Sequence, residues 1–438
     1  MKKTIGEDIP IPFGTPLGRM QVMLDLFREC WPILSWAAQN YRRRLAKKCR
    51  VVAVVGTFGK STASRCIATA LGRNPDRVSQ RNTKSFLARG ILQIRPNDRH
   101  AVIEVAIGGP GEMAPYAKMI RPDITVVTSI GSEHHDRLGS LERTRAEKCE
   151  MVRILPETGV AVLNGDDPNV RWMKEKTKAR AVHFGLGKNN VVRASNILLD
   201  WPQGTRFTLH VADKEYDMNV RLIGRPMVYS ILAGVAVAYA EGLSLSEVLP
   251  ALESLSPTPG RLQPVELPNG AWIIRDDCKS TVETVDAALD VFSEINARSK
   301  IAVFGEIYDP PGSPDAIYER VGERLAKVSS RIILIGDEDA RQYYEVGIRR
   351  MGFPDESLVY VNGNVAEAIE ILRKWLGPGD VALIKGSHRQ RLERIALSIS
   401  GRVVKCLLPY CNVKTSRCEY CSLLGQRWTI SKAQKDLS

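Results

Sequence analysis

Apolar runs of strand length alternate with amphipathic stretches of helix length through most of the chain. Four apolar runs, at 51–55, 102–106, 124–128 and 160–164, predict buried strands. Helical spacing of apolar residues marks the stretches 63–71, 112–120, 140–154, 232–241 and 245–255. Short alternating runs within 193–220 predict a small β insertion. Buried strands that alternate with helices indicate a mostly parallel sheet with helices on both faces.

The same alternation restarts after the turn-rich segment SPTPG at 256–260. Further buried strands are predicted at 272–274, 301–304, 332–335 and 381–384, with helices at 282–292, 316–326 and 365–375. The chain therefore predicts an α/β fold with two such domains. We expect four parts: a basic helical segment at 1–49, a central domain at 50–259, a second Rossmann-like α/β domain at 260–405 and a cysteine-containing tail at 406–438.

The N-terminal segment carries a helical pattern at about 20–48, with apolar residues three and four positions apart. Pro32 predicts a kink or a break within it. Basic residues gather at its end: Arg42, Arg43, Arg44, Lys47, Lys48 and Arg50. Two interpretations remain open, namely packing against the body of the protein and peripheral contact with a membrane surface.

A glycine-rich turn, GTFGKST at 56–62, separates the first predicted strand from the first helix. Strand, glycine turn and helix together point backbone N–H groups and the positive helix end at a phosphate. Gly56 and Gly59 permit the turn and the close approach of a ligand. Lys60 supplies a charge for the outer phosphates, and Ser61 supplies a hydroxyl for Mg²⁺. The general phosphate-loop pattern also has a glycine at position 54, where this chain has Val54.

Three further features of the central domain carry chemistry. Glu104 lies within the apolar run VIEVA, where a lone carboxylate is costly unless it meets a cation, so we expect a Mg²⁺ ligand. His134 and His135 lie in the segment SEHHD, directly after another predicted strand, where metal or phosphate chemistry is plausible. Lys148 on its own is an ordinary helix lysine.

Composition and charge bear on the localisation of the protein and on its partners. Hydrophobic residues make up 44% of the chain, and no uncharged apolar run is long enough to span a membrane. The polar, proline-rich start does not have the pattern of a signal peptide, so we expect a cytoplasmic protein. The formal net charge of +13 also suggests a nucleic-acid-binding NTPase as an alternative. No recognised nucleic-acid module supports that alternative, and no nucleic-acid partner is expected.

Taken together, the motifs resemble those of the Mur ligases, a family of ATP-dependent enzymes that join an amine to a carboxylate. The family's loop reads G-T-x-G-K-[ST]-[ST], which accounts for Val54. The resemblance covers about residues 50–400 and rests on these segments in order: GTFGKST, VIEVA, RPDITVVTSIGSEHHDRLGS, GVAVLNGDDP, DDCKSTVETVDAAL, IAVFGE and LIKGS. It implies a central P-loop ATPase domain and a second α/β domain. It also implies ATP and Mg²⁺ as cofactors, with a carboxylate and an amine or amino acid as substrates.

The resemblance also implies roles for individual residues. Lys60, His134 and Lys148 would be catalytic, and many family members carry the lysine at the position of Lys148 as a carbamate. The nucleotide would be bound by residues of the loop and of the second domain: Gly56, Thr57, Gly59, Lys60, Ser61, Thr62, Arg261, Asp277 and Lys279. The Mg²⁺ ligands would be Ser61, Glu104, His134 and Lys148.

Three departures from the family keep alternatives open. A family motif with a histidine and an asparagine near the adenine reads GRPMVYS here, at 224–230. Only about fifty residues precede the loop, so we expect an acid substrate other than a UDP-muramoyl peptide. The loop RNTKS at 81–85 carries added basic residues. The alternatives are the peptidoglycan enzyme that adds D-alanyl-D-alanine, and a Mur-like nucleotide-binding subunit without catalysis.

The tail holds four cysteines within sixteen residues: Cys406, Cys411, Cys418 and Cys421. One C-x2-C pair with two further thiols could form a closed, tetrahedral zinc site. The spacing is not that of two C-x2-C pairs, so an iron–sulfur cluster or reduced surface thiols stay open as alternatives. The other five cysteines are scattered and indicate ordinary reduced thiols.

Overall fold

The computed structural model describes residues 16–79, 81–132, 135–411 and 417–427. The chain forms two compact units. One unit is Leu26–Thr258, and the other combines Met1–Asp25 with Pro259–Ser438. The division at Thr258 falls within the proline-rich segment that follows the first set of alternating elements.

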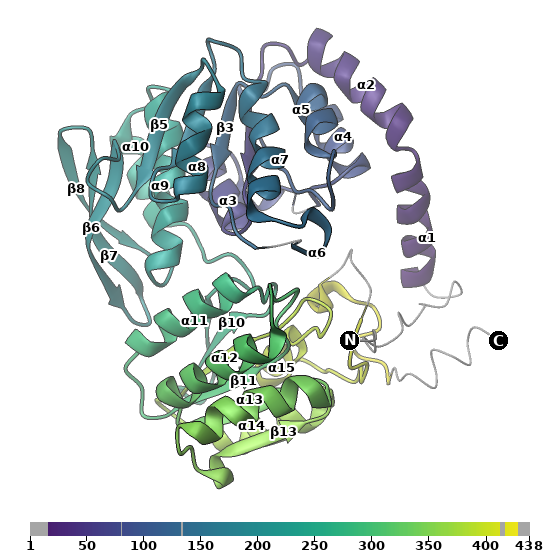
Figure 1. The fold of residues 1–438 in the computed structure, drawn as a ribbon, viewed down its shortest axis with the longest axis vertical. Coiled ribbons are helices and arrows are strands. Elements are labelled where there is room, and N and C mark those ends of the chain that lie inside the picture. The colour runs from purple at the N-terminus through teal and green to yellow at the C-terminus, as the bar shows by residue number, and fades with distance from the viewer. Residues whose placement is uncertain (1–15, 80, 133–134, 412–416, 428–438) are drawn as a thin grey trace. The chain divides into compact units, whose positions relative to one another are not determined.

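An eight-stranded sheet forms the centre of the unit Leu26–Thr258, in the order β2-β1-β3-β4-β5-β6-β7-β8 (Figure 1). Strands β1 to β5 pair in parallel, and β6 to β8 extend the sheet with antiparallel pairs. The predicted fold class and β insertion are confirmed. The strands are β1 (Arg50–Val55), β2 (His100–Glu104), β3 (Ile124–Val127), β4 (Val160–Asn164), β5 (Arg180–Gly185), β6 (Val192–Asp200), β7 (Gly204–Val211) and β8 (Lys214–Val220).

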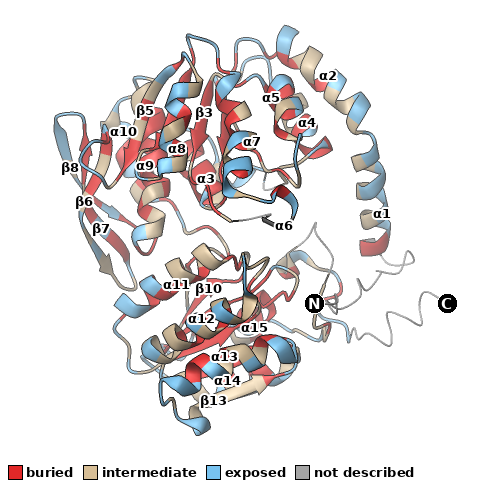
Figure 2. Ribbon diagram, viewed as in Figure 1, coloured by how far each residue is buried: buried red, intermediate tan, exposed pale blue. Residues whose placement is uncertain are grey.

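Helices cover both faces of this sheet, because its central strands are apolar on both sides (Figure 2). Residues of α3, α9 and α10 form one buried cluster with the strands, and residues of α4, α5 and α7 form another. The helices are α3 (Lys60–Ala70), α4 (Ser85–Leu92), α5 (Met113–Ile120), α6 (His135–Leu138), α7 (Leu141–Arg153), α8 (Pro168–Arg171), α9 (Arg225–Ala240) and α10 (Leu245–Glu253).

The N-terminal helical pattern is divided at Cys30 into α1 (Pro16–Glu29) and α2 (Trp31–Arg44). The predicted break is confirmed, and Pro32 lies in the first turn of α2, where its missing N–H removes no helical hydrogen bond. The inner side of α2 packs on α4 and α5. Trp31 makes an edge contact with Tyr116, and the Arg42 Nη2 atom lies 2.7 Å from the Asp123 Oδ2 atom.

A six-stranded sheet forms the second unit, in the order β13-β12-β11-β14-β10-β9. Along the sequence the strands β10 to β13 move outward across the sheet, and α14 then leads the chain back to β14, between β10 and β11. Because β10 to β14 are parallel, their carboxyl ends share one edge of the sheet. The strands are β9 (Gln263–Glu266), β10 (Trp272–Asp276), β11 (Lys300–Phe304), β12 (Arg331–Ile335), β13 (Leu358–Val361) and β14 (Val381–Lys385). The helices are α11 (Val282–Glu294), α12 (Pro314–Val328), α13 (Glu338–Arg350), α14 (Val365–Trp375) and α15 (Glu393–Ile399).

Four short 3-10 helices complete the described elements: η1 (Pro75–Arg77), η2 (Trp172–Lys176), η3 (Asp355–Ser357) and η4 (Cys418–Tyr420). None of the helices in the described ranges combines the length and the apolar character that crossing a membrane requires.

Candidate active site

The glycine loop joins β1 to α3, as the sequence predicts. Gly56 and Gly59 have φ of 148° and 80°, in the region that favours glycine. A Cβ atom at position 56 would lie 2.1 Å from the Thr128 Oγ1 atom, which leaves no room for a side chain there. The loop can therefore approach β3 closely only with glycine at this position.

Hydrogen bonds between the glycine loop and the segment after β3 fix the conformation of the loop. The Thr57 N–H donates to the Ser129 carbonyl at 2.9 Å, and the Phe58 N–H donates to the Ser129 hydroxyl at 3.0 Å. The Thr57 hydroxyl in turn accepts from the Gly131 N–H at 2.8 Å. These contacts fix the loop in front of the N-terminus of α3, where backbone N–H groups can bind an anion.

Two buried lysines meet at Thr57. The Lys60 ammonium donates to the carbonyls of Gly56 and Thr57 at 2.8 and 3.1 Å. The Lys148 ammonium, from α7, donates to the Thr57 hydroxyl at 2.9 Å. Their exposed fractions are only 7% and 3%. Two cations of low exposure beside a helix N-terminus form a strongly electropositive loop, which suits a polyphosphate.

Glu104 lies at the end of β2, next to Val54 of β1 in the parallel register. Its side chain is 4% exposed, and its Oε1 atom accepts from the Asn82 amide at 2.8 Å. Its Oε2 atom is buried and has no hydrogen-bond partner among the described residues. A buried carboxylate oxygen in this state fits a cation ligand, because burial of an unpaired charge is costly.

The structure locates only some of the other predicted ligands in the central domain. Ser61 and Thr62 occupy the first turn of α3. His134 lies outside the described residues, and His135 begins α6 without a described side chain. The histidine pair is therefore not located relative to Glu104.

The segment GRPMVYS begins α9. Gly224 precedes the helix with φ of 85°, and Pro226 lies in the first helical turn. The Tyr229 hydroxyl donates to the Asp166 Oδ2 atom at 3.0 Å, and Ser230 is buried. Burial, together with the nearby Asp166 carboxylate, raises the pKa of Tyr229. At the two positions where the family motif has a histidine and an asparagine, this chain has the partly exposed Pro226 and the buried Ser230.

In the second unit, the segment DDCKS follows β10. The Asp277 side chain is 1% exposed and accepts from the Arg275 Nε atom at 2.9 Å. Burial raises the pKa of Asp277 to about 6, although the Arg275 guanidinium acts in the opposite direction. Glu419, from the tail, forms a second ion pair with Arg275. The Asp277 carboxylate therefore points into the interior of the second unit.

The neighbouring Asp276 makes a separate buried pair with Lys385 of β14. The Lys385 ammonium lies 2.7 Å from the Asp276 Oδ2 atom and donates to the Lys279 carbonyl at 2.7 Å. Burial lowers the pKa of Lys385, and Asp276 opposes this effect. Of the predicted residues in this unit, Arg261 and Lys279 are partly exposed.

The four tail cysteines are free thiols. Cys406, Cys411 and Cys421 pack against the small apolar cluster of Leu17, Leu408 and Leu423. Within the described ranges, no three His, Cys, Asp or Glu side chains form a group that could hold a metal ion. The structure therefore gives the zinc interpretation no set of ligands, and it stays a prediction of the sequence.

Four residues that hold the candidate segments of the two units were not predicted from the sequence: Asn82, Ser129, Arg275 and Glu419. Asn82 and Ser129 lie in segments that the family resemblance includes or borders, so these segments were the available signal. Arg275 is a charged residue at the end of an apolar run, which is a signal for a buried pair. Glu419 offers no such signal, because its partner is 144 residues away in the sequence.

This combination of a glycine loop, two buried lysines and a second Rossmann-like unit defines a class of two-part α/β proteins that bind nucleotides. Residues 54–238 match the model of the Mur ligase middle domain, and residues 260–388 match that of the Mur ligase glutamate ligase domain. The chain belongs to the Mur ligase family, whose members are ATP-dependent ligases that form carbon–nitrogen bonds.

Individual relatives agree with the family models. The chain is 27% identical over 366 residues to the UDP-N-acetylmuramoyl-tripeptide–D-alanyl-D-alanine ligase of Mycobacterium tuberculosis, covering 79% of this chain and 72% of that protein. The Escherichia coli enzyme of the same name is 27% identical over 296 residues, covering 66% and 65% of the two chains.

Solved structures agree in fold. The MurF structure from Acinetobacter baumannii superimposes with a TM-score of 0.73 at 22% identity, covering 85% of this chain and 81% of that chain. The MurF ligase from Thermotoga maritima in complex with ADP gives a TM-score of 0.73 at 22% identity, covering 84% and 83%.

Proposed function

We propose that this protein joins a carboxylate to an amine through an acyl phosphate made from ATP. The observation that carries the proposal is the meeting of Lys60 and Lys148 at Thr57, beside the glycine loop. A carboxylate and a triphosphate repel each other, so a catalyst for their reaction must concentrate positive charge at the transferring phosphoryl group.

In the first step, a carboxylate oxygen of the acid attacks the γ-phosphorus of ATP. The bond from that phosphorus to the β–γ bridging oxygen breaks, and ADP leaves with the electron pair. Lys60 neutralises charge on the outer phosphates, and the N–H groups at the start of α3 orient them.

Mg²⁺ would be held by Ser61 and Glu104, and a second ion by His134 and Lys148. The unpartnered Glu104 oxygen supports the first assignment. Bound Mg²⁺ would offset phosphate charge. For Lys148, the second assignment requires a carbamate, because an ammonium cannot bind a cation. In that form the positive charge beside Thr57 would come from Lys60 and from the bound Mg²⁺ ion, whose charge of +2 would more than replace the ammonium of Lys148.

In the second step, the neutral amine attacks the acyl carbon, and phosphate leaves from the tetrahedral intermediate with the electron pair of the broken carbon–oxygen bond. The proton that the amine nitrogen loses goes to the departing phosphate. We assign Arg261 and Lys279 to nucleotide contacts, as the family resemblance implies. We assign Asp277 a positioning role: its side chain is buried against Arg275, and it would hold the segment that carries Lys279 in place.

We propose the substrates only as a carboxylate and an amine, a wider class than the names of the relatives suggest. Those relatives are named for UDP-N-acetylmuramoyl-tripeptide and D-alanyl-D-alanine. The peptidoglycan pair is one candidate, because the chain aligns with these enzymes over most of its length, and an acid other than a UDP-muramoyl peptide is the other.

The test is phosphate release from ATP and Mg²⁺ in the presence of acid and amine pairs. The peptidoglycan pair forms one arm, and panels of other acids and amines form the other. Release should require both members of one pair, and Lys60→Ala should lower it about 100-fold or more. The control is Lys188→Ala, at an exposed lysine far from the loop in the sequence. Unchanged release by the Lys60 variant would refute the ligase proposal. Nucleotide binding without release by any pair would favour a non-catalytic subunit.

Two further proposals concern the ends of the chain. The tail thiols are proposed to act structurally, by apolar packing or around Zn²⁺, and the zinc content of the purified protein separates these cases. A peripheral membrane contact is proposed for the N-terminal helices, and it does not depend on the ligase reaction.

A further inference from the structure

Exposed apolar side chains are concentrated in the N-terminal helices. Of the fourteen large hydrophobic residues that are exposed in the described ranges, four lie between Leu26 and Leu45, at the start of the unit Leu26–Thr258. Ile33 and Trp36 of α2 are 72% and 68% exposed. Trp36 is also the one exposed tryptophan among those that the structure describes. Such a concentration on a short segment marks an interaction surface.

The two sides of α2 differ in role. Trp31, Leu34, Ala38 and Tyr41 recur at helical spacing and pack against the buried cluster that includes α4 and α5. Ile33, Trp36, Arg43 and Arg44 recur at the same spacing on the opposite side and face solvent. The exposed side is therefore a fixed face of a docked helix.

Basic residues border the apolar pair. Arg43, Arg44, Lys47 and Lys48 are all exposed at the end of α2 and in the turn after it. The Gln39 amide donates to the Lys118 carbonyl at 3.4 Å, which brings the end of α5 beside α2. Lys118 and Arg121 at this end are exposed as well.

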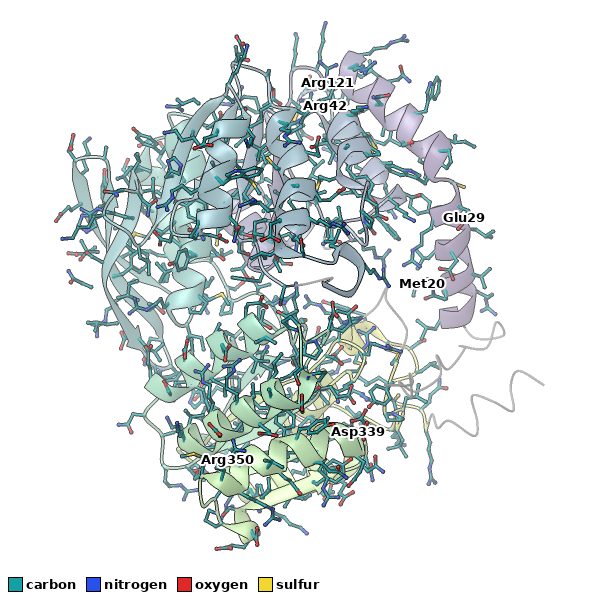
Figure 3. The ribbon with its side chains drawn as sticks, in the orientation of Figure 1. Met20, Glu29, Arg42, Arg121, Asp339 and Arg350 are labelled. Carbon is teal, nitrogen blue, oxygen red and sulfur yellow. The ribbon has the colours of Figure 1, made fainter. Side chains whose placement is uncertain are left out.

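The buried Arg42 fixes this arrangement. Its guanidinium donates to the carbonyls of Ile120 and Arg121, both at 3.1 Å, so the exposed Arg121 is held next to α2 (Figure 3). We call the exposed set the outer α2 surface: Ile33, Trp36, Arg43, Arg44, Lys47, Lys48, Lys118 and Arg121.

We propose that the outer α2 surface binds an anionic lipid bilayer. All its charged groups are positive, which matches an anionic headgroup layer. Its apolar members include a tryptophan, whose ring suits the boundary between headgroups and acyl chains. Ile33 and Trp36, even together with the exposed Leu45 in the turn after α2, are too few for the apolar core of a stable protein interface. They can insert beneath headgroups while the basic residues hold the surface. The protein would thus bind at the membrane surface with α2 parallel to it.

The test is flotation of the full-length protein with lipid vesicles. One set contains phosphatidylcholine, and the other adds about 30 mol % phosphatidylglycerol. We expect binding to the anionic set only, and its loss when the salt concentration rises from about 0.1 M to about 0.5 M.

Variants separate the two components of the surface. Arg43→Gln with Arg44→Gln should weaken binding about 25-fold, since each basic residue near the surface contributes about fivefold. Ile33→Ser with Trp36→Ser should weaken it on the order of tenfold or more. The matched controls are Lys178→Gln with Lys188→Gln, and Leu198→Ser, which remove exposed residues elsewhere and should leave binding unchanged. Thermal unfolding of each variant checks its fold.

Equal binding to both vesicle sets, or binding unaffected by the α2 variants, would overturn the proposal. Self-association that Trp36→Ser abolishes, without vesicle binding, would assign the surface to a second copy of the chain and also overturn it. Lys60→Ala should retain vesicle binding, so this result stands apart from the outcome for the ligase.

Discussion

Gly56 is the residue at which the loop tolerates no side chain. We expect Gly56→Ala to abolish nucleotide binding and to lower the free energy of unfolding by roughly 1–3 kcal/mol, because its Cβ would meet the Thr128 hydroxyl at 2.1 Å. Titration calorimetry with ADP and Mg²⁺, and urea unfolding, measure the two effects. Gly90→Ala in α4, where nothing lies within 4 Å, is the control. Normal nucleotide affinity in Gly56→Ala would contradict the geometry.

Glu306 predicts a pH dependence of stability. Burial, with Asp337 nearby, raises its pKa from 4.5 to about 7, although the hydrogen bond from Tyr410 acts in the opposite direction. The folded state therefore favours the protonated acid. Its contribution is complete below about pH 4.5 and is lost as the pH rises through about 7.

Glu306→Gln should remove this dependence, which amounts to roughly 3 kcal/mol between the two limits. The measurement is the free energy of unfolding of both proteins from about pH 4 to about pH 8, values that span the titration. Glu367→Gln, at an exposed position of α14, should keep the wild-type slope. Equal slopes for wild type and Glu306→Gln would show that this carboxyl does not titrate in the range.

At the scale of elements, the short helix η4 of the tail is linked to β10 by one charged side chain, that of Arg275. Arg275 pairs with Asp277 on its own strand segment and with Glu419 of η4. The side chain of Arg275 is only 7% exposed, so removal of one partner leaves a buried charge poorly compensated. The tail therefore supports the segment DDCKS from outside the sheet.

Glu419→Gln should lower the free energy of unfolding by on the order of 3 kcal/mol. Urea unfolding measures the loss, and Glu356→Gln at an exposed position should be neutral. If the two variants are equally stable, η4 does not support the segment.

The pattern of the elements explains which of them could be predicted. The ranges 160–164 and 365–375 agree with β4 and α14 residue for residue, because both carry strong apolar patterns. Neither α13 nor β13 was predicted. The helix α13 buries Ala340, Tyr344, Gly347 and Ile348 at helical spacing, but only Ile348 of these is strongly apolar, so the signal in the sequence is weak. The strand β13 is a run of only four residues, LVYV, of which Val361 alone is buried. The helix α9 begins at Arg225 rather than near residue 232, because Pro226 fits a first turn instead of ending the helix.

At the scale of the molecule, the two compact units, each with its own buried apolar residues, predict two unfolding transitions. The glycine loop lies in the unit Leu26–Thr258. In differential scanning calorimetry, ADP with Mg²⁺ should therefore raise the transition of this unit the most, by about 2.7 kcal/mol of stabilisation at a concentration 100 times the Kd. Lys60→Ala should lose the shift. A nucleotide shift that persists in this variant would place binding elsewhere.

Local sequence determined the glycine loop, because strand, turn and helix start are contiguous and obey short-range rules. It also determined the two α/β sheets, through apolar runs of strand length. Tertiary structure alone decided that Lys148 meets Thr57, 91 residues away, and that Glu104 is bound by Asn82 on one oxygen only. The order β2-β1-β3 brings these segments to one edge, and strand order depends on packing between distant segments rather than on any local pattern.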